Sequence, residues 1–307
     1  MNYSDELVEV LDEYLLPLRS IEEFLSKGGV GMKVLVEVPL GFKNVGLEVV
    51  RYLNNKGFRA YLSGQSVWGA CDFSVVGDYR YVIHLGHALP PNIFRIISRN
   101  FRLRREELND VIVVNIENGP TVLFSAVYYE PKPELISKAR ETLSDFIRLG
   151  IRPLIAYALP FKLYAHRIAE ILSAPLAPGP ITGCFVDFPI PDTVLLIGSG
   201  YFYPLTFKFL KPKTTVYLFD VFRGVVESVD NVYRRYLAMK VKAIQEFNSA
   251  RLVGIIISRK PGQYRPDLIE ALANRLRRLG KEFVIIDLNE ASPDYINNLP
   301  VDAVINT

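Results

Sequence analysis

The chain alternates short apolar segments with amphipathic ones, and this alternation constrains its fold more than any other feature. The segment KVLVEV at residues 33–38 has the composition of a buried strand, residues 44–57 have helical spacing and end in glycine, and residues 59–64 are apolar again. Strands that alternate with helices of these lengths are joined by right-handed crossovers and form parallel sheets. The pattern predicts an α/β protein.

The same alternation starts again twice further along the chain. A helix over residues 133–150 ends in glycine and is followed by strand, helix and strand patterns through residue 220. A long helix over residues 231–248 then precedes a third unit, in which Pro266 opens a helix that Gly280 ends. We therefore predict three similar small α/β domains with parallel sheets, at residues 1–130, 131–248 and 249–307.

The N-terminal segment has the spacing of a helix. Ser4 is followed by two acidic residues, and leucines then recur at positions 7, 11, 15 and 18. A serine cap before an apolar stripe of this period is typical of an amphipathic helix. We expect this helix to be part of the first domain.

Net charge and hydropathy exclude several classes of protein. The 307 residues carry 36 basic and 33 acidic side chains, a net charge of +3, far from the basic field of a dedicated nucleic-acid binder. The acidic N-terminus has neither the basic leader nor the apolar core of a secretion signal, and the least charged stretch, residues 193–207, is too short to span a membrane. We expect a cytoplasmic protein that uses neither nucleic acid nor membrane, with reduced thiols.

The chain has two cysteines, Cys71 and Cys184. Reduced cysteines are most often buried as small hydrophobic residues, and this interpretation stays open on the residues alone. Each of the two, however, follows a strand and helix segment in its own predicted domain. Thiols at related places in successive domains suggest ligands that meet at a shared centre, and Gly69 would let the backbone approach it closely.

Two histidines and a glycine pair mark further candidate positions. His84 and His87 are three apart at a strand end, so we expect them on opposite faces and not in a joint metal site, with His87 nearer the functional side. The GSG at residues 198–200 follows a strand but lacks the third glycine of a dinucleotide fingerprint. Gly200 still lies where parallel sheets bind ligands, at the carboxyl end of a strand.

The segment KPGQYR at residues 260–265 combines Lys260, Gly262 and Gln263 with an arginine, just before the helix that begins at Pro266. A glycine turn and basic side chains at a helix N-terminus are suited to hold a phosphate or carboxylate. An ordinary turn with charges facing solvent explains the same residues equally well.

The last residues, VDAVINT, have the apolar character of a strand inside the third sheet. Because chain ends more often emerge at the surface, we expect further residues after Thr307.

These motifs, taken together and in order, resemble the archaeal diphthamide synthase family, the 2-(3-amino-3-carboxypropyl)histidine synthases, from about Lys33 to the last residue. The resemblance is carried by five segments: GACD at 69–72, HLGH at 84–87, GC at 183–184, KPGQYR at 260–265 and VDAVINT at 301–307.

The resemblance implies three α/β domains, each contributing one cysteine to a central 4Fe-4S cluster, in a homodimer. Cys71 and Cys184 would be cluster ligands, and a third cysteine is expected about two positions beyond Thr307. It further implies a transferase in which an external electron donor reduces the cluster and the reduced cluster cleaves S-adenosylmethionine. The resulting 3-amino-3-carboxypropyl radical would add to a histidine of translation elongation factor 2, the first step of diphthamide biosynthesis. The residues expected near the cosubstrate are Gly200, Lys260, Gly262, Gln263 and His87.

The chain also departs from the family pattern. Where the family commonly has Asp-Gly and then Phe-His, this sequence has Ser199-Gly200 and then Phe202-Tyr203. An alternative is therefore a non-catalytic paralogue that dimerises with an active synthase and supports it. A cysteine codon soon after Thr307 would favour the enzyme, and a stop codon would favour the partner. Another three-domain iron–sulfur enzyme, such as a quinolinate synthase, fits GACD and KPGQ less well.

Overall fold

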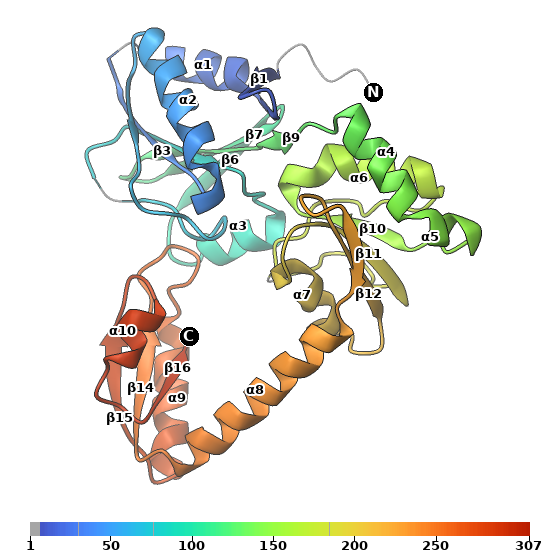
Figure 1. Ribbon diagram of the computed structural model, residues 1–307. Coiled ribbons are helices and arrows are strands. Elements are labelled where there is room, and N and C mark those ends of the chain that lie inside the picture. The colour runs from blue at the N-terminus through green and yellow to red at the C-terminus, as the bar shows by residue number, and fades with distance from the viewer. Residues whose placement is uncertain (1–6, 30, 76, 184) are drawn as a thin grey trace. The chain divides into compact units, whose positions relative to one another are not determined.

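The computed structural model describes residues 7–29, 31–75, 77–183 and 185–307 (Figure 1). Two compact units divide the chain. The larger unit holds the described residues within 1–69, 76–89 and 103–234, and the smaller unit holds residues 70–75, 90–102 and 235–307. The segment that contains Cys71 therefore packs with the C-terminal part of the chain.

The first sheet of the larger unit has six strands in the order β4-β3-β5-β8-β7-β6. Its parallel strands are β3 (Lys33–Glu37), β4 (Arg59–Leu62), β5 (Tyr81–Leu85) and β8 (Thr121–Ser125). The hairpin β6 (Leu103–Leu108) and β7 (Val111–Ile116) adds antiparallel strands, and Asn109 turns it with a φ of 48°. The crossover helix α2 (Lys43–Asn55) buries Val45, Val49 and Leu53.

The predicted N-terminal helix is wrong over residues 8–16. These residues form two short antiparallel strands, β1 (Val8–Val10) and β2 (Tyr14–Leu16), and β2 also pairs with β9 (Tyr128–Tyr129). Leu11 and Asp12 make the turn with φ values of 56° and 54°. The spacing of the leucines matches the period of a helix. Val8 and Val10, however, flank the exposed Glu9, and this alternation has the period of a strand. The helix α1 (Leu18–Ser26) begins only where the predicted one was to end.

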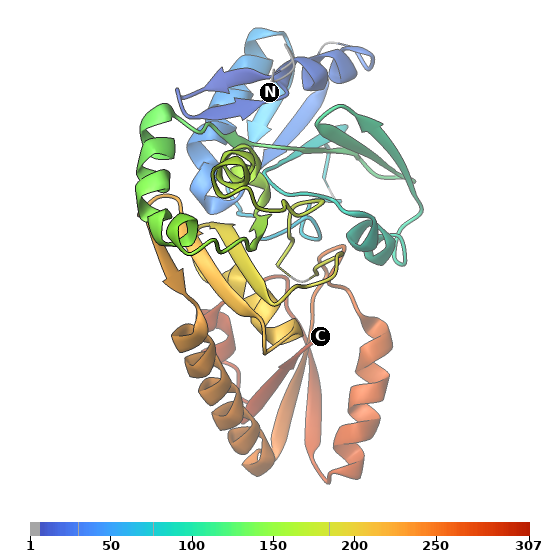
Figure 2. The ribbon, with the colours of Figure 1, turned by 90° about the vertical axis from the view of Figure 1, so that its right-hand side faces the viewer.

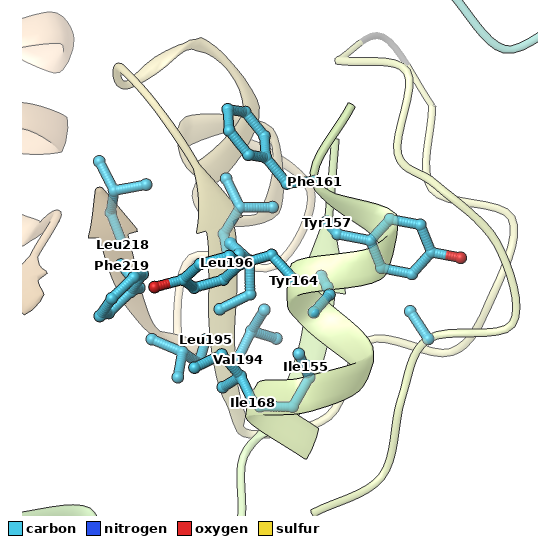
Figure 3. Packing of buried hydrophobic residues seen from close by; sticks show 14 of the residues in the cluster. Ile155, Tyr157, Phe161, Tyr164, Ile168, Val194, Leu195, Leu196, Leu218 and Phe219 are labelled. Carbon is cyan, nitrogen blue, oxygen red and sulfur yellow. The ribbon is translucent and has the colours of Figure 1, made fainter. Parts of the chain in front are cut away.

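The second sheet has the order β10-β11-β12-β13. Strands β10 (Leu154–Tyr157), β11 (Thr193–Gly198) and β12 (Thr215–Asp220) are parallel, and β13 (Val225–Ser228) is antiparallel. The helices of this segment are α4 (Pro133–Thr142), α5 (Ser144–Arg148), α6 (Lys162–Leu172) and α7 (Phe202–Leu210). The short turn η2 (Leu159–Phe161) precedes α6, and another, η1 (Leu40–Phe42), precedes α2. Figure 3 shows Tyr164 and Ile168 of α6 packed on β11 and β12.

The smaller unit contains the third sheet, with the order β15-β14-β16 and all strands parallel. Its elements are α3 (Pro91–Ile97), most of α8 (Asp230–Ser249), β14 (Leu252–Ile257), α9 (Pro266–Arg278), β15 (Glu282–Asp287), α10 (Pro293–Asn297) and β16 (Ala303–Asn306). Figure 2 shows α9 alongside this sheet. The segment VDAVINT does form a strand of this sheet, as predicted, but β16 pairs with β14 at an edge and is only partly buried, so the expectation of a buried core strand is wrong.

The predicted fold class is confirmed. Three α/β segments each carry a sheet with parallel strands, and the predicted long helix and the helix at Pro266 are present as α8 and α9. The domain limits at residues 130 and 248 stay predictions. In the part of the chain that the structure describes, no helix is both long and apolar enough to cross a bilayer.

Tyr164 offers a test of the second core. Its ring stacks on Phe219 with centroids 5.8 Å apart, and its hydroxyl donates to the Leu135 carbonyl at 2.7 Å. Tyr164→Phe should cost about 1 kcal/mol because it removes one buried hydrogen bond. Tyr164→Ala should cost about 3–5 kcal/mol through the cavity that it leaves. Urea unfolding of both variants measures this, and equal losses would contradict it.

Candidate functional site

Cys71 lies in the loop after β4, against the loop that follows β14. The backbone N–H of Gly262 donates to the Cys71 carbonyl at 2.9 Å. The two loops are far apart in sequence, yet residues 70–75 of the first loop and the whole of the second belong to the smaller unit. The structure thus brings the first predicted cluster ligand together with the KPGQYR motif.

Gly262 is required by this close approach. A Cβ atom at Gly262 would lie 2.1 Å from the Cβ of Cys71 and 2.8 Å from its Cα. Such distances are far inside van der Waals contact, so any side chain at this position would push the two loops apart. The glycine of the motif therefore serves the contact with the cysteine loop.

A nearly buried ion pair joins the same two loops. The Lys260 ammonium lies 2.6 Å from the Asp72 carboxylate, and each side chain is only 11% exposed. Paired in this way, each charge satisfies the other in a site where an unpaired charge would be costly. The sequence placed an acid directly after Cys71 but gave no sign that Lys260 would be its partner.

The Gln263 side chain lies beside the thiol. Its amide Nε2 donates to the Cys71 Sγ at 3.8 Å, while its Oε1 lies 3.5 Å from the Ser258 hydroxyl. Asn100, just after α3, donates from Nδ2 to the carbonyls of Pro261 and Tyr264 at 3.3 and 3.1 Å. Sequence reasoning missed Asn100 and Ser258, because no motif surrounds either residue.

The second predicted ligand, Cys184, lies outside the described residues. Its neighbour Gly183 has a φ of 76°, and a Cβ there would lie 2.1 Å from the ring of Phe202. The Thr206 hydroxyl donates to the Gly183 carbonyl. Glycine is thus required just before Cys184 for packing against α7. Within the described ranges, no three His, Cys, Asp or Glu side chains form a metal-binding group.

His84 and His87 contact each other, so the expectation that they face opposite ways is wrong. The His84 Nε2 lies 2.9 Å from the His87 Nδ1, and the Glu37 carboxylate lies 3.5 Å from the His84 Nδ1. The strand ends at Leu85, and Gly86 with a φ of 82° turns the chain back. This row of Glu37, His84 and His87 lies at the carboxyl ends of β3 and β5. Burial, and then the neighbouring His84, lower the pKa of His87 well below its usual value.

The predicted Gly200 loop lies at the carboxyl end of β11, next to the buried Asp220 at the end of β12. Gly200 has a φ of 72°, and the Ser199 hydroxyl lies 3.5 Å from the Asp220 carboxylate. Burial alone would raise the pKa of Asp220, but hydrogen bonds from the backbone and guanidinium of Arg223 outweigh it and lower the pKa. Contacts of Gly200, His87, Lys260, Gly262 and Gln263 with a cosubstrate stay predictions.

The chain belongs to the family of diphthamide synthesis proteins. The family model described as "Putative diphthamide synthesis protein" matches residues 38–307, which include all the motifs named above.

Curated relatives carry related names. The 2-(3-amino-3-carboxypropyl)histidine synthase of Methanocaldococcus jannaschii is 22% identical over 91% of this chain and 77% of its own, and that of Pyrococcus horikoshii is 21% identical over 89% and 77%. The human protein named subunit 1 of this synthase is 29% identical over 52% of this chain. The match spans only 40% of the length of that human relative.

The crystal structure of Dph2 from Pyrococcus horikoshii with a 4Fe-4S cluster is similar throughout. It matches with a TM-score of 0.73 and 20% identity over 97% of this chain and 83% of that one. At this identity the likeness shows that the two chains share their fold.

The surroundings of Cys71 fit a thiolate ligand of an iron–sulfur cluster. Such clusters are bound through cysteine sulfur, and hydrogen bonds to the sulfur tune their reduction potential. Cys71 is partly exposed, an amide donor points at its sulfur, and a glycine keeps the opposing loop at backbone distance. Nothing in this donor set disfavours soft iron.

The Asp72–Lys260 pair can be tested as a double-mutant cycle. Asp72→Asn or Lys260→Met alone removes one half of a nearly buried ion pair, and should cost on the order of 3 kcal/mol of unfolding free energy. The double variant should recover much of this loss, because neither charge remains. Urea unfolding measures all four chains. Strictly additive losses would show that the pair is not coupled.

His87 makes a prediction for pH. Its lowered pKa means that the folded chain keeps this imidazole neutral, whereas the unfolded chain takes up a proton near the usual pKa of 6.5. Its contribution to stability is therefore present above pH 6.5 and declines on acidification, by at most about 1.4 kcal/mol per pH unit. Unfolding of the wild type and of His87→Gln between pH 8 and 5 should show a shallower acid decline in the variant. An unchanged slope would count against this assignment.

Proposed function

We propose that this chain is an enzyme that transfers the 3-amino-3-carboxypropyl group of S-adenosylmethionine to a histidine of translation elongation factor 2. The observation that supports this most is the close packing of the Cys71 loop on the KPGQ loop, two motifs on which the family resemblance rests. The family, and the name 2-(3-amino-3-carboxypropyl)histidine synthase that the archaeal relatives carry, support the transfer of this group to a histidine.

Cys71 and Cys184 would hold the 4Fe-4S cluster, together with a further cysteine if the chain continues as the resemblance implies. When bound and reduced by an external donor, such a cluster supplies the electron that cleaves the sulfonium–carbon bond of S-adenosylmethionine, which starts the radical reaction. Over the whole reaction, the imidazole ring exchanges a C–H bond for a C–C bond. The sulfonium becomes methylthioadenosine, one proton is released, and the electron that cleaved the bond is given back as the radical adduct loses that proton, so the overall transfer consumes no reductant.

The residues of this chain contribute positioning. The Lys260–Asp72 pair and the Gly262 N–H hold the Cys71 loop in place, so that the thiol keeps its direction when the site fills. The Gly200 loop, open at the carboxyl end of β11, and the half-buried His87 at the end of β5 are candidates for contact with the cosubstrate. We further propose a homodimer that works in the cytoplasm.

A second candidate, a non-catalytic partner of an active synthase, is favoured by the Gly200 loop alone. Ser199 stands where the family commonly has an acid, and Tyr203 stands where it has a histidine. Ser199 contacts Asp220, which Arg223 already neutralises. This loop thus offers a cosubstrate fewer charged groups than the family pattern would.

Anaerobic reconstitution tests the proposed function. The protein produced from its complete gene should bind iron and sulfide and, once reduced, convert S-adenosylmethionine to methylthioadenosine. Elongation factor 2 should gain one 3-amino-3-carboxypropyl group by mass spectrometry. Cys71→Ala should lose most of the iron and the product, because a ligand is gone, whereas Ser66→Ala in the same stretch should lose neither.

The outcomes separate the two candidates. A protein that holds a cluster but forms no methylthioadenosine when reduced contradicts the enzyme. If product appears only after a second member of the family is added, the chain is the supporting partner.

A further inference from the structure

We propose that Gln263 is a positioning residue for the Cys71 sulfur: its side-chain amide donates a hydrogen bond to the thiolate and makes a cluster bound there easier to reduce. This inference rests on the proposed function, in that Cys71 is taken as a cluster ligand. It differs from the direct contact with S-adenosylmethionine that the family resemblance implies for this residue.

The direction of the amide is fixed by a neighbour. The Ser258 hydroxyl accepts from the Lys260 N–H at 3.2 Å, so its own proton is available for the Gln263 Oε1 at 3.5 Å. With the oxygen end held by a donor, the NH₂ end is the one that faces the Cys71 Sγ, at 3.8 Å. Ser258 is buried at the end of β14, which gives this arrangement a rigid base.

The main chain of the loop is held independently of this side chain. Asn100 binds the carbonyls on either side of Gly262 and Gln263, the Gly262 N–H binds the Cys71 carbonyl, and Lys260 binds Asp72. Loss of the Gln263 amide should therefore leave the loop in place. This separation makes the role of the amide measurable by itself.

The expected direction follows from charge. Reduction adds negative charge to a cluster and its thiolates, and a hydrogen-bond donor at a ligand sulfur stabilises the more negative state. Removal of the donor should therefore shift the reduction potential to more negative values. Replacement by a carboxylate should shift it further, because a negative group then faces the sulfur.

Redox titration of the reconstituted full-length protein, followed by electron paramagnetic resonance, tests the inference. Gln263→Leu keeps the side-chain bulk and should make reduction about tenfold less favourable, which is 59 mV for a one-electron couple. Gln263→Glu should exceed this shift. Ser258→Ala, which only releases the amide, should give a smaller shift in the same direction. Gln245→Leu, on the exposed surface of α8, should give none.

Iron and sulfide content separates positioning from simple damage. The Gln263 variants should keep wild-type iron per chain. Gly262→Ala, whose new Cβ would collide with Cys71, should lose most of it, while Gly64→Ala, with no atom near its Cβ, should keep it. Wild-type potentials in Gln263→Leu and Gln263→Glu overturn the inference alone. A wild-type chain that binds no cluster overturns the proposed function and the inference with it.

Discussion

The contact on which the candidate site depends joins two loops that lie 188 residues apart, at Asp72 and Lys260. Three contacts join the loops at the same place. The Gly262 N–H binds the Cys71 carbonyl, Gly262 leaves room for Cys71 because it has no side chain, and Lys260 forms a nearly buried ion pair with Asp72. The glycine contact tolerates the least displacement, because the backbone of one loop lies at van der Waals distance from the other. Together they hold the backbone of the Cys71 loop in place through contacts between loops.

Local signals in the sequence predicted the regular elements well. Pro266, the apolar spacing that follows it and Gly280 predicted α9, and the apolar runs predicted most parallel strands, because both depend on residues close together in the chain. The N-terminal hairpin was missed where leucine spacing and β-alternation compete over the same few residues. The family motifs pointed to Cys71 as a cluster ligand and to the KPGQ loop as part of the same functional site.

What could not be predicted is how these positions meet. Opposite charges in two distant motifs do not reveal that Asp72 and Lys260 are partners, and nothing near Asn100 indicates that it holds a loop. The rule that residues three apart on a strand face opposite ways does not apply to His84 and His87, because the strand ends between them, where Gly86 has a left-handed backbone conformation. The chain belongs to the diphthamide synthesis proteins, and in the proposed function the contacts around Cys71 serve to position a cluster ligand.

Cys71 lies in a short segment that leaves the larger unit and packs in the smaller one. The residues just before position 70 and those between 77 and 89 belong to the larger unit, whereas residues 70–75 pack with the C-terminal segment. The backbone on either side of the Cys71 segment therefore belongs to the larger unit, whereas the packing contacts of this segment lie in the smaller unit. A local opening of the smaller unit would therefore move the thiol together with the loop after β14.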